Sequence, residues 1–386
     1  SDSMAFQPDS FTRKPDSGAT GSGAMAVHTL GSVASLERAL GSACTVLRID
    51  GSDLLAGSQE GTLACWSVDS GSECWRIEMA GPISDLAVSD GRVYAAASSN
   101  LHSLDASSGE AIWSRPLEGA SDYVQVWDGV VWAASSVYEI EISDYTESTV
   151  WMFDSEGSLK ERWTFPERAW HFGLHNDGGV LLGLGRPRCG LLRIRSDEGA
   201  THHPLMGSSP VTVGACGSGG RFLIGHSDGS VSVVVDSAAE SSEERSSPVR
   251  AICGSNQDWL SGHDTGEVVS SRGWTVSASG AVESLAAGPS GSEGSGIWAS
   301  RWDGATSSVV IVDATDGSVL LELEHGHRIR HIQSADGNIA LGDSSGRIHL
   351  IEESVLSRRL EEATGESDDD ERRSRLMERL RQFRNA

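Results

Sequence analysis

Between Ala24 and Glu353 the chain alternates short apolar runs with polar turns that are rich in Gly, Ser and Asp. The apolar runs return at a spacing of about 8–12 residues, which is typical of an all-β fold. A convincing helical period is absent from this stretch of sequence. The pattern therefore predicts many short antiparallel strands joined by tight turns.

The predicted strands fall into groups of four. In one unit they span Ser84–Val88, Arg92–Ala97, Leu101–Asp105 and Ala111–Pro116. Turns that contain Asp-Gly, Glu-Gly or Ser-Gly suit hairpins in which a residue takes a positive φ. Eight units are predicted, and their first strands start near Val46, Ser84, Tyr123, Trp170, Val211, Val249, Val282 and Ile329.

A signature of Asp, then Gly, then Trp recurs between the apolar runs of these units. Its return at intervals of roughly 35–50 residues indicates stacked or radially arranged units rather than one asymmetric core. The final copy carries Leu321 in place of the Trp. The residues of the signature are Asp69 and Trp75, Asp105, Gly109 and Trp113, Asp154 and Trp163, and Asp313.

The last unit, from Ile329 to Glu353, shows only three strands. A ring of blades has no exposed edge, so the missing strand must come from elsewhere in the chain. We expect Ala26–Leu30 to supply it, which gives a propeller of eight four-stranded blades closed by N- and C-terminal strands. Seven blades is the alternative, because the sixth and seventh units are weakly marked.

The segment Asp105–Trp113 resembles the repeat of quinoprotein-like (PQQ-repeat) β-propellers. Leu54–Trp66 and the Gly326-His327 pair are similar to WD40 repeats. The resemblance covers roughly residues 26–353 and implies a β-propeller. It further implies that the Trp packs between adjacent blades, that the Asp and Gly shape the turn, and that His327 forms a hydrogen bond within its blade.

The strongly negative net charge of the chain bears on which class of partner it binds. A formal charge of −25 argues against nucleic acid, because phosphate binding needs a concentrated positive surface. Lys14 and Lys160 are the only lysines, so arginine carries nearly all the positive charge. This composition resembles proteins of halophilic archaea, with codon bias as the alternative explanation.

The chain lacks the features of a stable membrane insertion. It contains no run of 18 apolar residues, so we expect no transmembrane helix. Residues 1–23 are rich in Ser, Gly, Pro and Asp, and we expect a disordered tail rather than a signal peptide. These features favour a cytoplasmic protein.

Metal and cofactor sites are not predicted. The six cysteines form no Cys-x-x-Cys pair, and most lie in apolar runs, so we expect buried free thiols. His325, His327 and His331 fall within seven residues and could ligate a metal. His327 already has a structural explanation as the hydrogen-bonding residue of its blade, and His331 falls inside a predicted strand.

Catalysis is not expected either. Quinoprotein dehydrogenases hold a quinone and Ca²⁺ with the help of a vicinal disulfide, and this chain has no Cys-Cys pair. Nucleophile-elbow, Walker A, dinucleotide-binding and zincin motifs are absent from the sequence.

A partner surface is expected where loops interrupt the regular scaffold. The third unit carries an insertion, Val137–Thr149, and Arg, Trp and Tyr near it are types enriched at binding hot spots. The alternative is that these loops are simply solvated. The candidate residues are Tyr138, Tyr145, Glu167, Arg168, Trp170, His171, Arg186 and Arg188.

The second candidate surface is a helical C-terminal extension over residues 354–386. Leu376, Leu380 and Phe383 are spaced so that they form one apolar stripe on a helix. The stripe could pack on the propeller, dock into a partner or a second copy, or touch an anionic membrane, and a disordered tail is the remaining alternative.

The sequence therefore predicts a disordered tail over residues 1–23, a β-propeller over 24–353 and a helical extension over 354–386. We expect a non-catalytic scaffold that binds another protein. The alternatives are a PQQ-dependent or other enzyme with its site in the central funnel, and an envelope-assembly propeller resembling the outer-membrane-barrel assembly lipoproteins.

Overall fold

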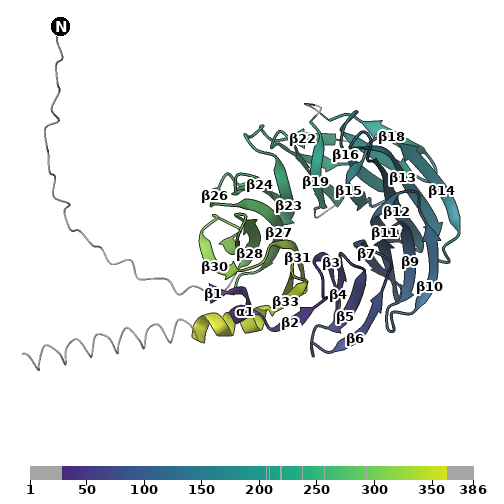
Figure 1. Ribbon diagram of the computed structural model, residues 1–386. Coiled ribbons are helices and arrows are strands. Elements are labelled where there is room, and N and C mark those ends of the chain that lie inside the picture. Colours follow the sequence, from purple (N-terminus) through teal and green to yellow (C-terminus); the bar gives the residue numbers. More distant parts are fainter. Residues whose placement is uncertain are drawn as a thin grey trace, which may run out of the picture.

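The protein is an eight-bladed β-propeller (Figure 1). The computed structural model describes residues 28–362 apart from 206, 208, 218, 219, 237, 256, 292 and 293. In each blade the strands follow one another from the inside of the ring outwards as an antiparallel sheet. Eight blades are confirmed over the seven-bladed alternative, and every predicted unit start lies in the innermost strand of a blade.

Blades 1 to 4 form the first half of the ring, and each runs from its inner to its outer strand along the chain. Blade 1 comprises β3 (Cys44–Asp50), β4 (Asp53–Ser58), β5 (Thr62–Ser67) and β6 (Glu73–Glu78); blade 2 comprises β7 (Ile83–Ser89), β8 (Arg92–Ala97), β9 (Asn100–Asp105) and β10 (Ala111–Pro116). Blade 3 comprises β11 (Ala120–Trp127), β12 (Val130–Glu139), β13 (Asp144–Asp154) and β14 (Leu159–Phe165); blade 4 comprises β15 (Ala169–Leu174), β16 (Val180–Leu184), β17 (Leu191–Arg195) and β18 (Gly199–His203).

Blades 5 to 8 complete the ring. Blade 5 comprises β19 (Val211–Cys216), β20 (Arg221–His226), β21 (Val231–Val235) and β22 (Ala238–Ser241); blade 6 comprises β23 (Val249–Ser255), β24 (Asp258–His263), β25 (Glu267–Ser270) and β26 (Thr275–Ser277). Blade 7 comprises β27 (Ala281–Pro289), β28 (Ser295–Trp302), β29 (Ser307–Asp313) and β30 (Val319–His325); blade 8 comprises β31 (Ile329–Ala335), β32 (Asn338–Asp343), β33 (Arg347–Glu352) and the N-terminal strand β2 (Leu36–Ala39).

Ring closure by an N-terminal strand is confirmed, but the strand differs from the one predicted. Leu36–Ala39, not Ala26–Leu30, pairs antiparallel with β33 as the outer strand of blade 8. The shorter strand β1 (His28–Thr29) adds instead to blade 7, parallel to β30. Between them, the one-turn helix α1 (Leu30–Val33) buries Leu30 and Val33 in the core beside blades 7 and 8. The closing strand therefore begins further along the chain than predicted.

The recurring Trp and Gly join neighbouring blades. The indole N–H of Trp75 in blade 1 donates to the carbonyl of Ala106 in blade 2 at 2.8 Å. A Cβ at Gly109 would lie 2.7 Å from the Trp75 ring, so only glycine lets the indole approach this turn. Trp113 repeats the arrangement on blade 3, where its indole donates to Ser155 at 2.9 Å and its ring lies against Gly157.

The recurring Asp residues organise the turns that receive these indoles. The carboxylates of Asp105 and Asp154 each accept backbone N–H groups two to four residues further along the chain. Asp313 accepts the N–H of Thr315 in the same way. The first unit differs, because the Ser67 hydroxyl accepts the N–H of Ser70 while Asp69 is exposed.

Trp163 has a different environment from the other signature tryptophans. It stacks on Trp132 with ring centroids 5.7 Å apart, and Trp132 donates its indole N–H to Gly178 of blade 4 at 3.1 Å. Blades 3 and 4 are therefore joined through a tryptophan of the second strand.

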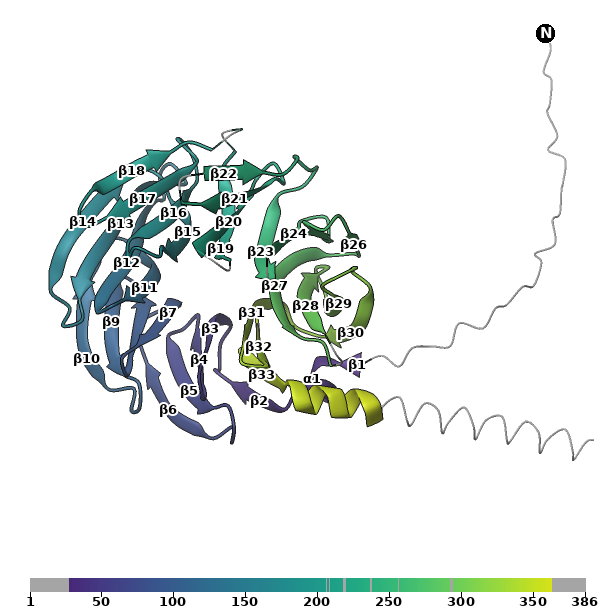
Figure 2. The same cartoon turned by 180° about the vertical axis from the view of Figure 1, so that it is seen from behind.

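A helix follows the last strand over residues 353–362 and lies beside α1 and β2 (Figures 1 and 2). Leu356 is fully buried, and Leu360 packs against the same core. The Arg359 guanidinium donates to the carbonyls of Ser32 and Ala34 at 2.6 and 2.7 Å. This first part of the predicted extension is docked on the propeller, next to the N-terminal segment.

Candidate functional site

The third blade carries a hairpin that extends beyond the other strands of its sheet. The pairs Val137↔Glu147, Tyr138↔Tyr145 and Glu139↔Asp144 join β12 to β13. The inner strand stops at the pair Ala120↔Ser136 and the outer strand at Ser148↔Phe165. Three residue pairs in a two-stranded ribbon project roughly 10 Å at the usual rise of a strand. The predicted insertion is thus a hairpin that stands above its blade.

The tip of this hairpin exposes apolar side chains. Ile140 and Ile142 in the turn are 83% and 60% exposed, and Tyr138 is 50% exposed. Glu139 and Glu141 alternate with the two isoleucines. A clustered set of exposed apolar side chains is a sign of an interaction site, unlike apolar residues scattered singly over a surface. The two isoleucines were not predicted as binding residues, although the Glu-Ile-Glu-Ile alternation is visible in the sequence.

At the base of the hairpin, Arg168 contacts two aromatic rings that meet edge-on. Its guanidinium carbon is 4.1 Å from the centroid of the Tyr145 ring and 4.6 Å from that of Trp170. The Tyr138 ring meets Tyr145 edge-on at 5.1 Å. Four of the predicted binding residues therefore form one cluster, in which cation–π contacts fix the arginine.

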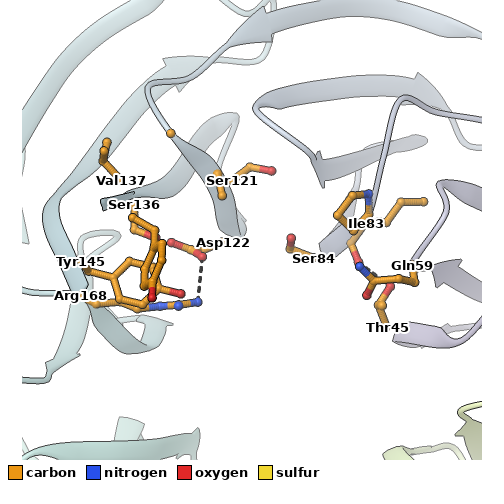
Figure 3. A pocket seen from close by; sticks show the side chains of 14 residues that line it. Thr45, Gln59, Ile83, Ser84, Ser121, Asp122, Ser136, Val137, Tyr145 and Arg168 are labelled. Atoms are coloured by element: carbon orange, nitrogen blue, oxygen red, sulfur yellow. Dashed lines mark hydrogen bonds and ion pairs between the residues drawn. The ribbon is translucent and has the colours of Figure 1, made fainter. Parts of the chain in front are cut away.

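Asp122 forms an ion pair with this arginine. A guanidinium nitrogen of Arg168 lies 3.1 Å from the Asp122 carboxylate, as the dashed line in Figure 3 shows. Burial raises the pKa of Asp122, and the positive charge of Arg168 opposes that rise. The carboxylate thus pairs with the guanidinium, which also contacts the two mutually perpendicular rings of Tyr145 and Trp170.

A pocket of about 760 Å³ opens beside this cluster. In Figure 3 the side chains of Arg168, Tyr145 and Asp122 lie on one side of it, and those of Thr45 and Gln59 lie opposite. The pocket is lined by blades 1 to 3 and the link into blade 4. Its remaining lining residues are Pro82, Ile83, Ser84, Gly119, Ala120, Ser121, Ser136, Val137 and Tyr138.

The other predicted residues of blade 4 do not join the cluster. Glu167 is fully buried and accepts two hydrogen bonds from Arg188, at 2.5 and 2.7 Å. Burial raises the pKa of Glu167, but the bonds and charge of Arg188 outweigh it, so the pKa lies below its ordinary value. This ion pair fastens the link to the neighbouring turn, where Arg186 is exposed.

His171 is buried, which corrects its selection as a surface residue. Its ring lies edge-on to Phe222 at 5.9 Å, and a Cβ at Gly214 would lie 2.4 Å from the imidazole. Burial lowers the pKa of His171 to about 4. The side chain therefore packs between blades 4 and 5 and is not available to a partner. Leu376, Leu380 and Phe383 lie outside the described residues.

The WD40-like hydrogen bond to the aspartate of blade 8 is made by His325, at the end of β30 in blade 7, which corrects the assignment to His327. The His325 Nε2 lies 2.7 Å from the buried carboxylate of Asp343. His327 is exposed, and its ring contacts His325 at 5.8 Å. The bond joins the end of β30 in blade 7 to the end of β32 in blade 8, whereas the Gly-His signature marks the histidine two positions further on.

Two groups of described residues offer three metal ligands each, and neither matches the triplet considered from sequence. One comprises Asp53, Cys65 and Cys74, and the other comprises His325, Asp343 and His349. Cys74 and Cys216 are exposed, which corrects the expectation of buried thiols at these two positions, while the other four cysteines are buried. Within residues 28–362, as far as they are described, no helix has the length and apolar character needed to cross a bilayer.

The comparisons with known proteins agree with this architecture. A PQQ-repeat family model, described as outer membrane protein assembly factor BamB, matches residues 15–138 and 59–354. A comparison with curated proteins found no match.

Similar solved structures include the computationally designed Ika8 protein and Sqt1 of Saccharomyces cerevisiae. Ika8 is 16% identical, with a TM-score of 0.66 over 82% of this chain and 98% of its own. Sqt1 is 12% identical, with a TM-score of 0.66 over 83% of this chain and 98% of its own. At these identities the likeness establishes the fold alone.

Proposed function

The chain belongs to the PQQ-repeat family described as outer membrane protein assembly factor BamB, and from that premise we propose that it is a scaffold that binds another protein. The binding surface comprises the hairpin residues Tyr138, Ile140 and Ile142 together with Arg168 and Trp170. We call this set the hairpin surface.

The observation that carries the proposal is the pair of exposed isoleucines on a ribbon that stands above a rigid ring. Burial of Ile140 and Ile142 against a partner would remove a large apolar area from water, which is the main driving force of association. Because Glu139 and Glu141 flank them, the matching partner surface is apolar with basic residues around it.

The base of the hairpin is arranged before any partner arrives. Asp122 and the two aromatic rings already hold the Arg168 side chain. Side chains fixed in advance lose little conformational entropy on binding, so more of the contact energy appears as affinity. Arg, Trp and Tyr are also the types that dominate the energetics of protein interfaces.

The test is an affinity purification from native lysate, at matched high salt, with four forms of the protein. They are the full chain, a chain truncated after Glu362 that keeps the docked helix with Leu356 and Arg359, the double variant Ile140→Ser/Ile142→Ser, and the control Val319→Ser/Leu320→Ser. The control removes two apolar side chains that are also exposed but lie on the outer strand of blade 7.

We expect a stoichiometric partner that the control retains and the hairpin variant loses. If the truncated chain alone loses the partner, the C-terminal extension is the docking element and the hairpin surface is not. Equal recovery by all four forms, or no recovered protein, would contradict the proposal.

The absence of catalysis is part of the same proposal. It is supported by the ion pair between Arg168 and Asp122 in the pocket lining, because two charged groups that bind each other are not free to act on a substrate. The check is the absorption spectrum and calcium content of purified protein. A bound quinone or a tightly held Ca²⁺ would favour an enzyme with its site in the funnel instead.

A second candidate is an assembly factor for outer membrane proteins, which the description of the matching family favours. It shares the protein-binding surface and differs in the partner. Binding of a labelled, unfolded outer-membrane protein, measured by fluorescence anisotropy, distinguishes the two. Saturable binding that is lost in Ile140→Ser/Ile142→Ser would favour the assembly role.

We also propose that the protein works in the cytoplasm of a halophile. The support is the charge of −25 with only two lysines. Like charges on the folded surface repel each other, and salt screens that repulsion. The melting temperature should therefore rise steadily from low to molar KCl, and a flat or falling profile would contradict the halophilic assignment.

A further inference from the structure

Three side chains with metal-ligand atoms converge where blades 7 and 8 meet. His325 ends β30, Asp343 ends β32, and His349 lies in β33. One ligand atom from each lies within 4.8 Å of the others, and the two imidazole centroids are 5.0 Å apart. Two imidazoles and one carboxylate form a donor set that suits zinc and related divalent ions.

His349 is buried without a hydrogen-bond partner on either ring nitrogen among the described residues. The side chain is 2% exposed. Its Nε2 lies 4.0 Å from Oδ2 of Asp343, and its Nδ1 lies 3.5 Å from Oε1 of Glu37. A buried polar atom without a partner costs stability, so such an atom in a native protein calls for an explanation.

In blades 5 and 6 the histidine at the end of the second strand has direct hydrogen-bond partners. His226 ends β20 as Asp343 ends β32, and its Nε2 bonds the Ser232 hydroxyl, six residues on, at 2.8 Å. His263 in blade 6 bonds the Ser261 hydroxyl and the Ser247 carbonyl, both at 3.0 Å. In blade 8 the residue six positions after Asp343 is His349. Its Nε2 and Oδ2 of Asp343 are 4.0 Å apart, too far for the direct bond that joins His226 to Ser232 in blade 5.

The Asp343 carboxylate is oriented toward this gap. Its Oδ1 accepts the N–H and hydroxyl of Ser345, at 2.8 and 2.7 Å, and the N–H of Arg347 at 2.9 Å. With three donors on one oxygen, Oδ2 is left facing the two histidines. The turn therefore presents one carboxylate oxygen in a fixed direction.

We propose that His325, Asp343 and His349 bind one divalent transition-metal ion, for which zinc is the probe. Tetrahedral ligands at about 2.0–2.1 Å from zinc lie about 3.3–3.4 Å from one another. Oδ2 of Asp343 lies 2.7 Å from Nε2 of His325 and 4.0 Å from Nε2 of His349, so the two separations bracket that value and small side-chain rotations would seat one ion. Binding displaces the hydrogen bond between His325 and Asp343, and the ring proton of the neutral His325 then sits on Nδ1.

Glu37 completes the arrangement from the closing strand. Its carboxylate lies next to Nδ1 of His349, the nitrogen that faces away from Asp343. A carboxylate behind a ligating histidine fixes the tautomer and the orientation of the ring. Because Glu37 lies in β2, the ion would couple the N-terminal strand to β33 and stabilise the closure of the ring.

The experiment uses the full chain without a histidine tag, freed of metal by a chelator and then titrated with Zn²⁺. We expect one equivalent of zinc per chain and a higher melting temperature in Zn²⁺ than in Mg²⁺. Co²⁺ should give the visible absorption of a nitrogen- and oxygen-ligated ion. His349→Asn and Asp343→Asn should abolish binding, and Glu37→Gln, at a partly exposed residue, should weaken it about 10–100-fold.

Matched controls separate this site from others. His203→Asn removes a histidine of blade 4 and should leave the affinity unchanged. Cys74→Ser disables the group of Asp53, Cys65 and Cys74, so zinc that is lost in this variant, or a cobalt spectrum with thiolate charge-transfer bands, would overturn the assignment. Absence of zinc binding to the wild type, or binding that Glu37→Gln and His349→Asn leave intact, would also overturn it.

Discussion

The two ends of blade 3 differ in what their residues contact. At one end the turn after β13 receives the indole of Trp113, and the Asp154 carboxylate caps the backbone of that turn. At the other end the β12–β13 hairpin leaves its sheet and exposes Ile140 and Ile142. The same two strands thus serve packing at one end and offer a free surface at the other.

This difference separates stability from binding within a single blade. Substitutions in the Trp-binding turn should lower the unfolding free energy without removing any contact to a partner. Substitutions at the hairpin tip should weaken partner binding and leave the unfolding free energy nearly unchanged. Four predictions test this division, beginning with the largest expected change.

Gly157→Ala should cause the largest loss of stability. The added Cβ would lie 2.7 Å from the Trp113 ring, in a backbone conformation with φ of +76°. Strain and overpacking together should cost about 2–5 kcal/mol of unfolding free energy, measured by chemical denaturation. The control is Gly129→Ala, which has a similar φ of +74° but open space around the Cβ, and it should lose only about 1–2 kcal/mol. Equal losses would show that the indole contact is unimportant.

Acid should weaken the packed interior, and His171 should account for part of the loss. Its pKa falls from 6.5 to about 4 on folding because burial disfavours the charged ring. Above pH 6.5 the ring is neutral in both states and costs the folded protein nothing. Between pH 6.5 and 4 only the unfolded chain binds the proton, so the unfolding free energy falls by up to about 3 kcal/mol. His171→Gln should flatten this part of the stability profile, whereas His327→Gln, at an exposed residue, should not. A profile unchanged by His171→Gln would refute the assignment.

Arg168→Gln tests the residue at the base of the hairpin. It removes two cation–π contacts and leaves the carboxylate of Asp122 without its partner, at a cost of about 1–3 kcal/mol. It should also raise the pKa of Asp122 further, which NMR titration would detect. Arg162→Gln, which removes a more exposed arginine over Trp151, should cost less than about 0.5 kcal/mol. If the two variants lose the same stability, the cluster around Arg168 is not pre-arranged.

Ile140→Ser/Ile142→Ser should have the smallest effect on stability. Both side chains face solvent, so the unfolding free energy should change by no more than about 0.5 kcal/mol. Partner recovery should nevertheless fall by tenfold or more if the hairpin surface binds as proposed. A stability loss as large as that of Gly157→Ala would mean that the tip is part of the packed structure.

Much of the candidate site followed from residue types. Tyr138, Tyr145, Arg168 and Trp170 were selected because they stood in or near an insertion, and they do meet in one cluster. Glu167 and His171 stood just as close in sequence, but both are buried. His171 lies on the packed face of β15, because a strand alternates between its two faces, and Glu167 is held in the link by its ion pair with Arg188. Trp274, whose ring lies against Gly317, was missed because its blade lacks the Asp of the signature.

The sequence by itself determined the fold class and most of the strands of each blade, and it favoured eight blades while leaving seven as the alternative. These depend on local alternation and on turn residues, which act over a few positions of the chain. Only the tertiary structure decided which N-terminal segment closes the ring, which histidine bonds Asp343, and that His349 and Glu37 lie beside it. The contacts of the closing strand join residues more than three hundred positions apart, such as Leu36 and Leu350, so they depend on how the ring closes and no local pattern encodes them.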